Sequence, residues 1–187
     1  MTQKEKLTPP AIGQIWPGQG GIYGGLRQYS EGLCHVIYAE NDVPGRHEYG
    51  RYGVSVEAAE SRADGRANTL ALLNSLIASI GEQINAGALI SEVLDQIPAD
   101  KRAEYQAAIV AATYTAEGHT DFYLPSIGEL HHAWQYLPES FATDWYYWSS
   151  TQFSAHYACT MDFGSGWLYV NVKDNERVVR PVRRFIQ

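Results

Sequence analysis

Residues 121–130 read DFYLPSIGEL and residues 147–151 read YWSST, and these two stretches decide the fold. In the first stretch, Ser126 and Glu129 have the spacing of a capping box, in which each side chain satisfies a free backbone amide at the start of a helix. The sequence therefore predicts a helix over residues 127–136. The second stretch is aromatic and hydroxyl-rich, which is typical of a strand.

The residues that follow alternate between strand-like runs and turns. Turn sequences at residues 164–166 (GSG) and 173–175 (KDN) interrupt the runs. Regular short strands separated by such turns predict an antiparallel meander. The runs cover residues 145–150, 157–162, 167–172 and 178–184.

Upstream, the chain predicts a hairpin followed by helices. Residues 34–39 are rich in β-branched and aromatic side chains, with a turn at residues 30–32. Apolar residues then recur at helical spacing, with Asp64 or Asn68 available as an N-cap. The expected helices cover residues 70–80, 84–95 and 98–115. The fold class is therefore α+β, with an N-terminal hairpin, two to four helices and a C-terminal antiparallel sheet.

A length of 187 residues suits one domain. We expect residues 1–11 to be a flexible N-terminus and residues 12–187 to form the domain, with residues 81–101 as a helical elaboration. Arg180 and Arg183 lie among apolar neighbours, so we expect them to fix strands and loops through carboxylates or carbonyls. Trp148 is expected in the core.

Charge and hydropathy exclude some partners. The net charge is −7, which lacks the basic footprint that a sequence-independent nucleic-acid binder needs. No apolar run approaches the roughly 18 residues needed to span a membrane, so we expect no membrane insertion. Residues 1–10 lack the apolar stretch of a secretory signal. These observations predict a virion or a cytoplasmic location.

Aromatic composition favours a contact surface. The chain has 13 Tyr and 5 Trp against 5 Phe. Tyr and Trp combine an apolar body with a polar tip, so they suit binding surfaces as well as cores.

An ordered set of motifs resembles the Lcl C-terminal-like domain family, a group of bacterial and phage domains with a C-type-lectin-like fold. The chain is also similar to the variable proteins of diversity-generating retroelements, which share that fold. The resemblance covers residues 12–185 and is weakest over residues 81–101. The motifs are Asp64-Gly65 with Ala67-Asn68-Thr69, Asp121 to Ser126 with Glu129-Leu130, Tyr147 to Thr151, Asp162-Phe163-Gly164, and Val179 to Phe185.

The resemblance implies a binding role for the terminal sheet. Framework residues would hold the scaffold, while side chains between Thr151 and Arg177 would face outward and contact a ligand. The candidate ligand-binding residues are Gln152, Phe153, His156, Tyr157, Cys159, Met161, Trp167, Tyr169, Asn171, Lys173 and Asn175.

Residues for catalysis or metal binding are not arranged in the expected patterns. Cys34 and Cys159 form no local pair, which disfavours the copper chemistry of the formylglycine-generating enzymes; free thiols are expected, with a single disulfide as the alternative. His131 and His132 point about 100° apart on a helix, so they do not share one metal. The Glu-Pro-Asn and Trp-Asn-Asp triplets of calcium-binding lectins are missing, and so is a Gly-x-Ser-x-Gly elbow. We expect no catalytic residue, no metal and no cofactor.

The function expected from the sequence is ligand binding without catalysis. The leading hypothesis is a phage- or prophage-encoded C-type-lectin-like protein that binds a protein or glycan receptor and is a target for retroelement diversification. The alternative is an intracellular interaction protein that binds and modulates a host protein. As a receptor-binding protein, the chain would form a homo-oligomer or attach to a larger assembly.

Overall fold

The structure is a computed structural model that describes residues 7–82, 87 and 89–187. Its α-helices are α1 (Gly65–Ser79), α2 (Ile90–Gln96), α3 (Gln106–Ala112) and α4 (Ile127–Tyr136), and its short 3-10 helices are η1 (Glu57–Ala59), η2 (Ala99–Tyr105) and η3 (Pro138–Ser140). Its strands are β1 (Ile15–Trp16), β2 (Gly21–Tyr29), β3 (Gly32–Tyr38), β4 (His47–Glu48), β5 (Tyr146–Gln152), β6 (Tyr157–Asp162), β7 (Leu168–Val172), β8 (Glu176–Arg177) and β9 (Val182–Ile186).

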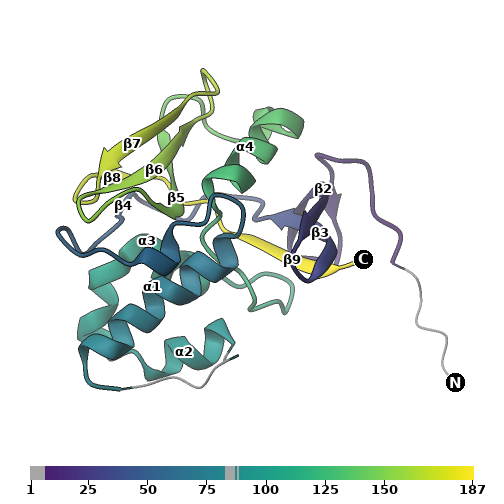
Figure 1. The fold of residues 1–187 in the computed structure, drawn as a ribbon. Helices are drawn as coiled ribbons and strands as arrows, with labels where there is room; N and C mark the ends of the chain where they lie inside the picture. The colour runs from purple at the N-terminus through teal and green to yellow at the C-terminus, as the bar shows by residue number, and fades with distance from the viewer. Residues whose placement is uncertain (1–6, 83–86, 88) are drawn as a thin grey trace, which may run out of the picture.

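The strands form three antiparallel sheets. Their orders are β1-β2-β3-β9, β4-β8 and β5-β6-β7. Helices α1, α2 and α3 lie together on one side of the molecule, and α4 lies between the sheet of β5–β7 and the sheet of β2, β3 and β9 (Figure 1). The predicted α+β class, the N-terminal hairpin and the meander over residues 145–172 are confirmed.

The last strand-like run does not join the meander, so that part of the prediction is wrong. Val178 contacts β5, where its backbone exchanges hydrogen bonds with Tyr146 and Trp148. The chain then crosses to the other sheet, and β9 pairs with β3 from Val182↔Tyr38 to Ile186↔Cys34. A strand-like composition predicts extended backbone, but the choice of partner depends on contacts far away in the sequence.

The predicted helices differ from the observed ones mainly in their bounds: α4 matches its prediction, α1 begins earlier than expected, and the two expected helices between them are shorter or divided. Asp64 caps α1 by accepting a hydrogen bond from the Ala67 amide at 2.9 Å. The helix expected over residues 84–95 lies in part outside the described residues, and α2 covers its second half. The helix expected over residues 98–115 divides into η2 and α3. Of the proposed elaboration over residues 81–101, the described part packs its apolar side chains against α1 and α3. Residues 1–6 of the expected flexible N-terminus lie outside the described residues.

Glu129 joins several elements in the core. Its side chain is fully buried and accepts hydrogen bonds from the Ser126 amide at 2.7 Å and the Gly65 amide at 3.0 Å. Its other carboxylate oxygen accepts from the hydroxyls of Tyr29 at 2.7 Å and Tyr123 at 2.8 Å. The capping box is confirmed, and its glutamate also ties β2, α1 and α4 together.

The C-terminal arginines also fix the fold. Arg180 pairs with Asp42 at 2.6 Å and Arg183 with Asp121 at 2.7 Å. Both guanidinium groups are buried while their carboxylate partners lie nearer the surface. The structural role expected of both arginines is confirmed, and so is the core position of Trp148.

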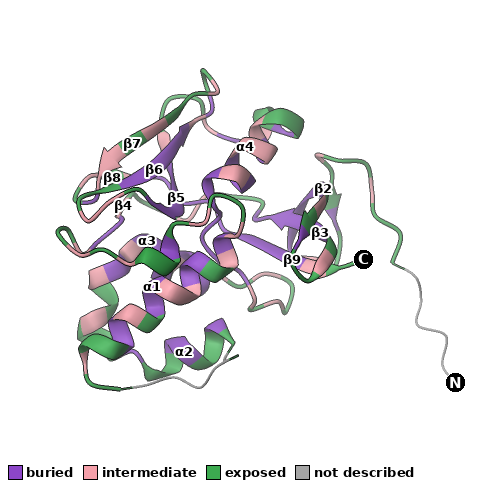
Figure 2. Cartoon of the chain, in the orientation of Figure 1, coloured by how far each residue is buried: buried purple, intermediate pink, exposed green. Residues whose placement is uncertain are grey.

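Burial differs between the strands of the meander. Most residues of β5 and β6 are buried, whereas β7 alternates between exposed and partly buried residues (Figure 2). The exposed part of the C-terminal sheet is therefore β7 and the two hairpin turns, rather than the whole sheet. Among the described residues, no helix has the length and apolar character required to cross a membrane.

Candidate functional site

The register of the meander places its side chains on two faces. Thr160 pairs with Tyr169, and Met161 pairs with Leu168. Because neighbouring residues of a strand point to opposite sides, Tyr169 and Asn171 lie on one face, and Leu168 and Val170 on the other. We call these the Tyr169 face and the Leu168 face.

The Tyr169 face carries a cluster of aromatic rings and guanidinium groups. The rings of Tyr146 and Tyr169 meet edge to face with centroids 5.3 Å apart, and the Trp167 ring lies 5.9 Å from that of Tyr169. The Arg177 guanidinium lies 5.5 Å from the centre of the Tyr146 ring, a cation–π distance. A similar contact of 4.1 Å places the guanidinium of Arg46 over the ring of Trp145. We call this cluster the aromatic–arginine patch, made of Arg46, Trp145, Tyr146, Trp167, Tyr169 and Arg177.

Backbone pairing brings the distant members of the patch together. His47 of β4 pairs with Arg177 of β8, which brings Arg46 close enough for its charge to help lower the pKa of Arg177. Arg46 precedes its ring partner Trp145 by about 100 residues. The indole of Trp148 holds β4 in place by donating a hydrogen bond of 2.8 Å to the His47 carbonyl. Strands β4, β5 and β8 therefore hold these patch residues together.

The turn before Trp167 is ordered by its own hydrogen bonds. The Asp162 carboxylate accepts from the Gly164 amide at 2.9 Å and from the Ser165 hydroxyl at 2.6 Å. Gly166 has a φ of +77°, and a Cβ at this position would overlap the ring of Trp134. These constraints fix the turn, so Trp167 is presented at 64% exposure from a rigid position.

The patch contains two guanidinium groups, with Asp144 and Glu176 next to its members in the sequence and Asp162 close to Tyr169. The Arg177 side chain donates to the Asn171 side-chain carbonyl and to the Glu176 backbone carbonyl, both at 2.7 Å, while its buried Nε has no partner. Partial burial lowers the pKa of Arg177 from its ordinary value. Within the part of the chain that the structure describes, neither Arg46 nor Arg177 forms an ion pair with a carboxylate. Both guanidinium groups can therefore contact oxygen atoms of a ligand.

A second exposed aromatic group lies at the other end of the meander. Here the ring of His156 lies 4.7 Å from that of Tyr52. Phe153 and Tyr157 are exposed beside them at the β5–β6 turn. The Gly53 amide donates to the Ala155 carbonyl at 2.9 Å, which holds the loop of Tyr52 against this turn.

The structure divides the sequence-predicted residues into three groups. Trp167, Tyr169 and Asn171 lie together on the Tyr169 face, and Asn175 is half-buried in the β7–β8 turn, where its amide bonds to the Val172 carbonyl. Phe153, His156 and Tyr157 lie at the opposite end. Gln152, Cys159, Met161 and Lys173 are buried, so the expectation that they face outward is wrong.

The buried residues have clear physical reasons for their position. β6 is the central strand of the meander, and Cys159 and Met161 point from it into the main core. The Lys173 amine is enclosed, donating to the carbonyls of Val54 and the Gln152 side chain, both at 2.7 Å. Burial lowers the pKa of Lys173 to about 8. The two hydrogen bonds of the Lys173 amine connect the β7–β8 turn to the loop that precedes η1 and to the end of β5.

Four patch residues were missed by the sequence analysis: Arg46, Trp145, Tyr146 and Arg177. Trp145 and Tyr146 were assigned to a strand without a site role, and Arg46 lies in a polar loop with no local motif. Only the β4–β8 pairing reveals that the two arginines share a surface.

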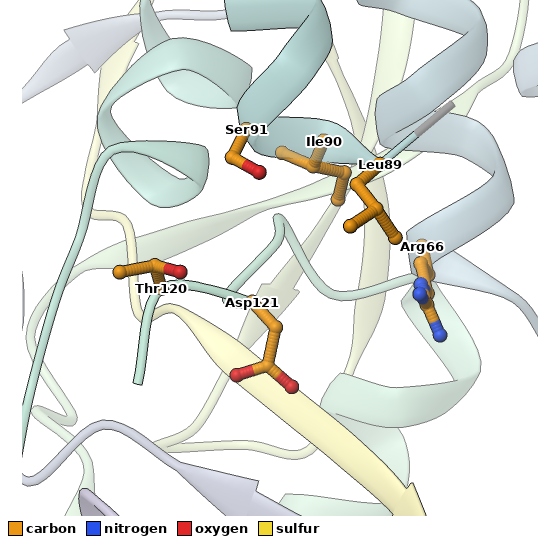
Figure 3. Close-up of a pocket in the computed structure, with 6 residues that line it drawn as sticks. All are labelled: Arg66, Leu89, Ile90, Ser91, Thr120 and Asp121. Carbon is orange, nitrogen blue, oxygen red and sulfur yellow. The ribbon is translucent and has the colours of Figure 1, made fainter. Parts of the chain in front are cut away.

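Two depressions lie away from the patch. One is a cavity of about 80 Å³ whose lining side chains come from the starts of α1 and α2 and from the turn before Phe122 (Figure 3). Its volume is far below the roughly 300 Å³ at which ligand pockets begin, and its Asp121 is paired with Arg183. It is lined by Arg66, Leu89, Ile90, Ser91, Thr120 and Asp121. The other is a shallow, open, apolar depression beside α1, lined by Val56, Ala58, Ala67, Leu70, Ala71, Asn74, Ser75 and Ala78.

Residues that could hold a metal do not gather within the described ranges. No group of three or more His, Cys, Asp and Glu side chains converges there. Both cysteines are buried and free. The chemistry that the surface offers is contact through rings, guanidinium groups and the amide of Asn171.

Comparisons with known proteins place the chain in no family. No protein-family model and no curated protein matches it. Among solved structures, it is similar to the crystal structure of a fimbrial protein from Bacteroides ovatus, with a TM-score of 0.46 and 13% sequence identity. The match covers 79% of this chain and 35% of that protein, so the chain spans about a third of the fimbrial protein's length. This likeness is too distant to assign a fold family or a function.

Proposed function

We propose that this protein binds a macromolecular ligand without catalysis, through the Tyr169 face of its C-terminal sheet. The observation that carries the proposal is the aromatic–arginine patch. Trp, Tyr and Arg are the residues that contribute most to binding energy at protein interfaces. Their rings also stack on the apolar faces of sugars, so the partner is a protein or a glycan receptor.

Preorganisation supports this proposal. Binding usually costs about 0.5–1.5 kcal/mol for each mobile side chain that becomes fixed. In the patch, the ring of Tyr146 is already held between Tyr169 and Arg177, and that of Trp145 beneath Arg46. Less conformational entropy is therefore lost when a ligand arrives.

The shape of the site supports a broad contact. The six patch residues come from strands β5, β7 and β8 and the segments beside them, and none of them lines either depression described above. A surface of this kind suits the face of a folded protein or an extended polysaccharide. Its two guanidinium groups favour ligands that present carboxylate or carbonyl oxygens.

We extend the proposal to the origin of the chain. The ordered motifs from Asp64 to Phe185 support a C-type-lectin-like domain of the Lcl C-terminal-like kind, encoded by a phage or prophage. Trp167, Tyr169 and Asn171 are the positions at which retroelement diversification would alter specificity without disturbing the core. A reverse transcriptase gene and a template repeat beside this gene would test that part.

A second function uses the same face. An intracellular protein that binds and modulates a host protein would also present rings and guanidinium groups on a sheet. The patch residues line neither of the two depressions described above, which supports a protein surface over a small sugar for this role.

A capture experiment distinguishes these functions. The immobilised protein would be probed with a glycan array and with host-cell lysate, beside a Trp167→Ala/Tyr169→Ala variant and a Tyr136→Ala control. Tyr136, an aromatic residue at the end of α4, is 55% exposed, against 64% for Trp167. We expect a ligand that the wild type and the control retain and the double variant loses. Equal retention by all three proteins would refute the proposed site.

A further inference from the structure

β7 is an open edge of the three-stranded sheet. Among the strands that the structure describes, it pairs with β6 alone. The amide of Asp162 donates to the carbonyl of Trp167, and the amide of Lys173 to the carbonyl of His156. In an antiparallel ladder the residues of one strand alternate between facing the partner strand and facing away from it. Tyr169 and Asn171 therefore direct their backbone groups toward β6, while Leu168 and Val170 direct theirs away from the sheet.

The sequence of β7 does not protect this edge. Exposed edge strands usually carry charged side chains, proline or a bulge, which prevent pairing with another chain. Residues 168–172 read LYVNV and contain neither charge nor proline. The β6–β7 register is regular, whereas β5–β6 and β2–β3 both contain a register shift. Leu168 is 43% exposed and Val170 is 45% exposed.

The other sheet edges differ from β7. The free side of β5 is covered where the backbone of Val178 bonds to Tyr146 and Trp148. β1 is only two residues long, and the edge strand β9 carries Arg183 and Arg184. Among the described strands, β7 therefore stands out as a regular, uncharged edge available for pairing.

We propose that the edge of β7 pairs with β7 of a second copy of this chain, antiparallel, about a two-fold axis at Val170. This arrangement sets Val170 opposite Val170 and Leu168 opposite Val172 of the second copy. These residues share the outward backbone orientation, so Val170 can exchange hydrogen bonds with its copy. In the Leu168–Val172 pair, the Val172 carbonyl already accepts from the Asn175 amide at 3.0 Å, and its second lone pair would accept from Leu168. This pairing of apolar residues follows from their positions at 168, 170 and 172 along the strand.

Self-complementarity argues for a second copy as the occupant. On the Leu168 face, apolar side chains would meet only apolar side chains. No like charges oppose one another along the paired segment, despite a net charge of −7 on each chain.

The dimer would have a larger binding surface. Three strands from each copy would form one sheet of six. A two-fold axis perpendicular to the sheet keeps both Tyr169 faces on the same side, so two aromatic–arginine patches would face a multivalent ligand together. The pairing itself does not depend on the proposed function.

Substituting charged residues for Val170, which lies on the proposed two-fold axis, tests the pairing. Sedimentation of the wild type over a concentration series should show a monomer–dimer equilibrium, and Val170→Lys and Val170→Glu should each be monomeric. An equimolar mixture of the two variants should restore the dimer, because Lys then faces Glu. The matched control is Leu33→Lys on β3, a similarly exposed apolar strand residue, which should dimerise like the wild type.

Three outcomes would overturn the proposal. They are a wild type that stays monomeric at every concentration, a mixture that stays monomeric although both variants are folded, and a Leu33→Lys control that loses the dimer as well. Each would show that the edge of β7 does not hold two copies together.

Amide exchange of the wild type provides a test that needs no variant. The amides of Leu168 and Val170 should exchange slowly in the dimer and rapidly after dilution. The amides of Tyr169 and Asn171 should stay slow in both conditions, because they bond to β6. Fast exchange at Val170 in a concentrated, dimeric sample would place the interface elsewhere.

Discussion

The ring of Tyr169 on β7 meets the ring of Tyr146 on β5 edge to face, at an interplanar angle of 90°. This contact reaches across the central strand β6, and Arg177 lies against the same Tyr146 ring. The aromatic–arginine patch is thus built by side chains from three strands, which explains how a small sheet can present large aromatic side chains in fixed positions.

Replacing Glu129 with Gln should destabilise the protein strongly. The substitution removes the buried charge near Arg184 and gives a side-chain amide two N–H donors where the protein also supplies donors, from Gly65 and Ser126. Breaking one partner of a buried charged network costs about 3–5 kcal/mol. Urea denaturation of Glu129→Gln would measure this loss. The exposed Glu139→Gln serves as the control and should change the free energy of unfolding by less than about 0.5 kcal/mol.

Lys173 should make stability depend on pH in the alkaline range. Its pKa in the folded protein is about 8, lowered by burial from 10.5. Between these values the unfolded chain binds a proton that the folded chain does not, so the free energy of unfolding from this group rises as the pH increases from about 8. The free energy of unfolding rises by at most about 1.4 kcal/mol per pH unit from this group.

A Lys173→Met variant isolates this contribution. Methionine fills similar space, but the carbonyls of Val54 and Gln152 lose their donor, which costs about 1–3 kcal/mol. Denaturation of both proteins between pH 7 and pH 10 would show a steeper rise for the wild type. Parallel profiles would contradict the burial of a neutral amine at high pH.

Both cysteines should be unreactive in the folded protein. Burial raises the pKa of Cys34 and of Cys159, so little thiolate forms at neutral pH and reagents have no direct access. A thiol-reactive chromophore should label the native protein slowly and label both cysteines rapidly in denaturant. Fast labelling of one native cysteine would show that its surroundings open readily.

Local sequence patterns predict much of the secondary structure of this fold, but they do not predict the composition of the candidate site. Ser126 and Glu129 predicted α4 because a capping box is a local arrangement of backbone amides. The destination of β9 could not be predicted, since its pairing with β3 joins residues about 150 positions apart. Strand composition shows that a segment is extended but does not identify its neighbour.

The same reasoning explains the errors within the predicted site. The resemblance predicts outward-facing side chains from Thr151 to Arg177, but β6 lies in the middle of its sheet and buries Cys159 and Met161. Lys173 belongs to the same window, in which the resemblance implies outward-facing side chains. Lys173 is enclosed because Val54 and Gln152 replace that water.

The affinity of the captured partner for single patch variants tests the central claim most directly. Titration calorimetry would compare the wild type with Trp167→Ala and with the exposed control Tyr136→Ala, after thermal unfolding has shown that all three are folded. Truncating a residue that anchors an interface costs about 2 kcal/mol or more, which weakens binding at least about thirtyfold. We predict that loss for Trp167→Ala and an unchanged affinity for Tyr136→Ala. An unchanged affinity for Trp167→Ala, with the partner still bound, would contradict the assignment of the Tyr169 face as the binding surface.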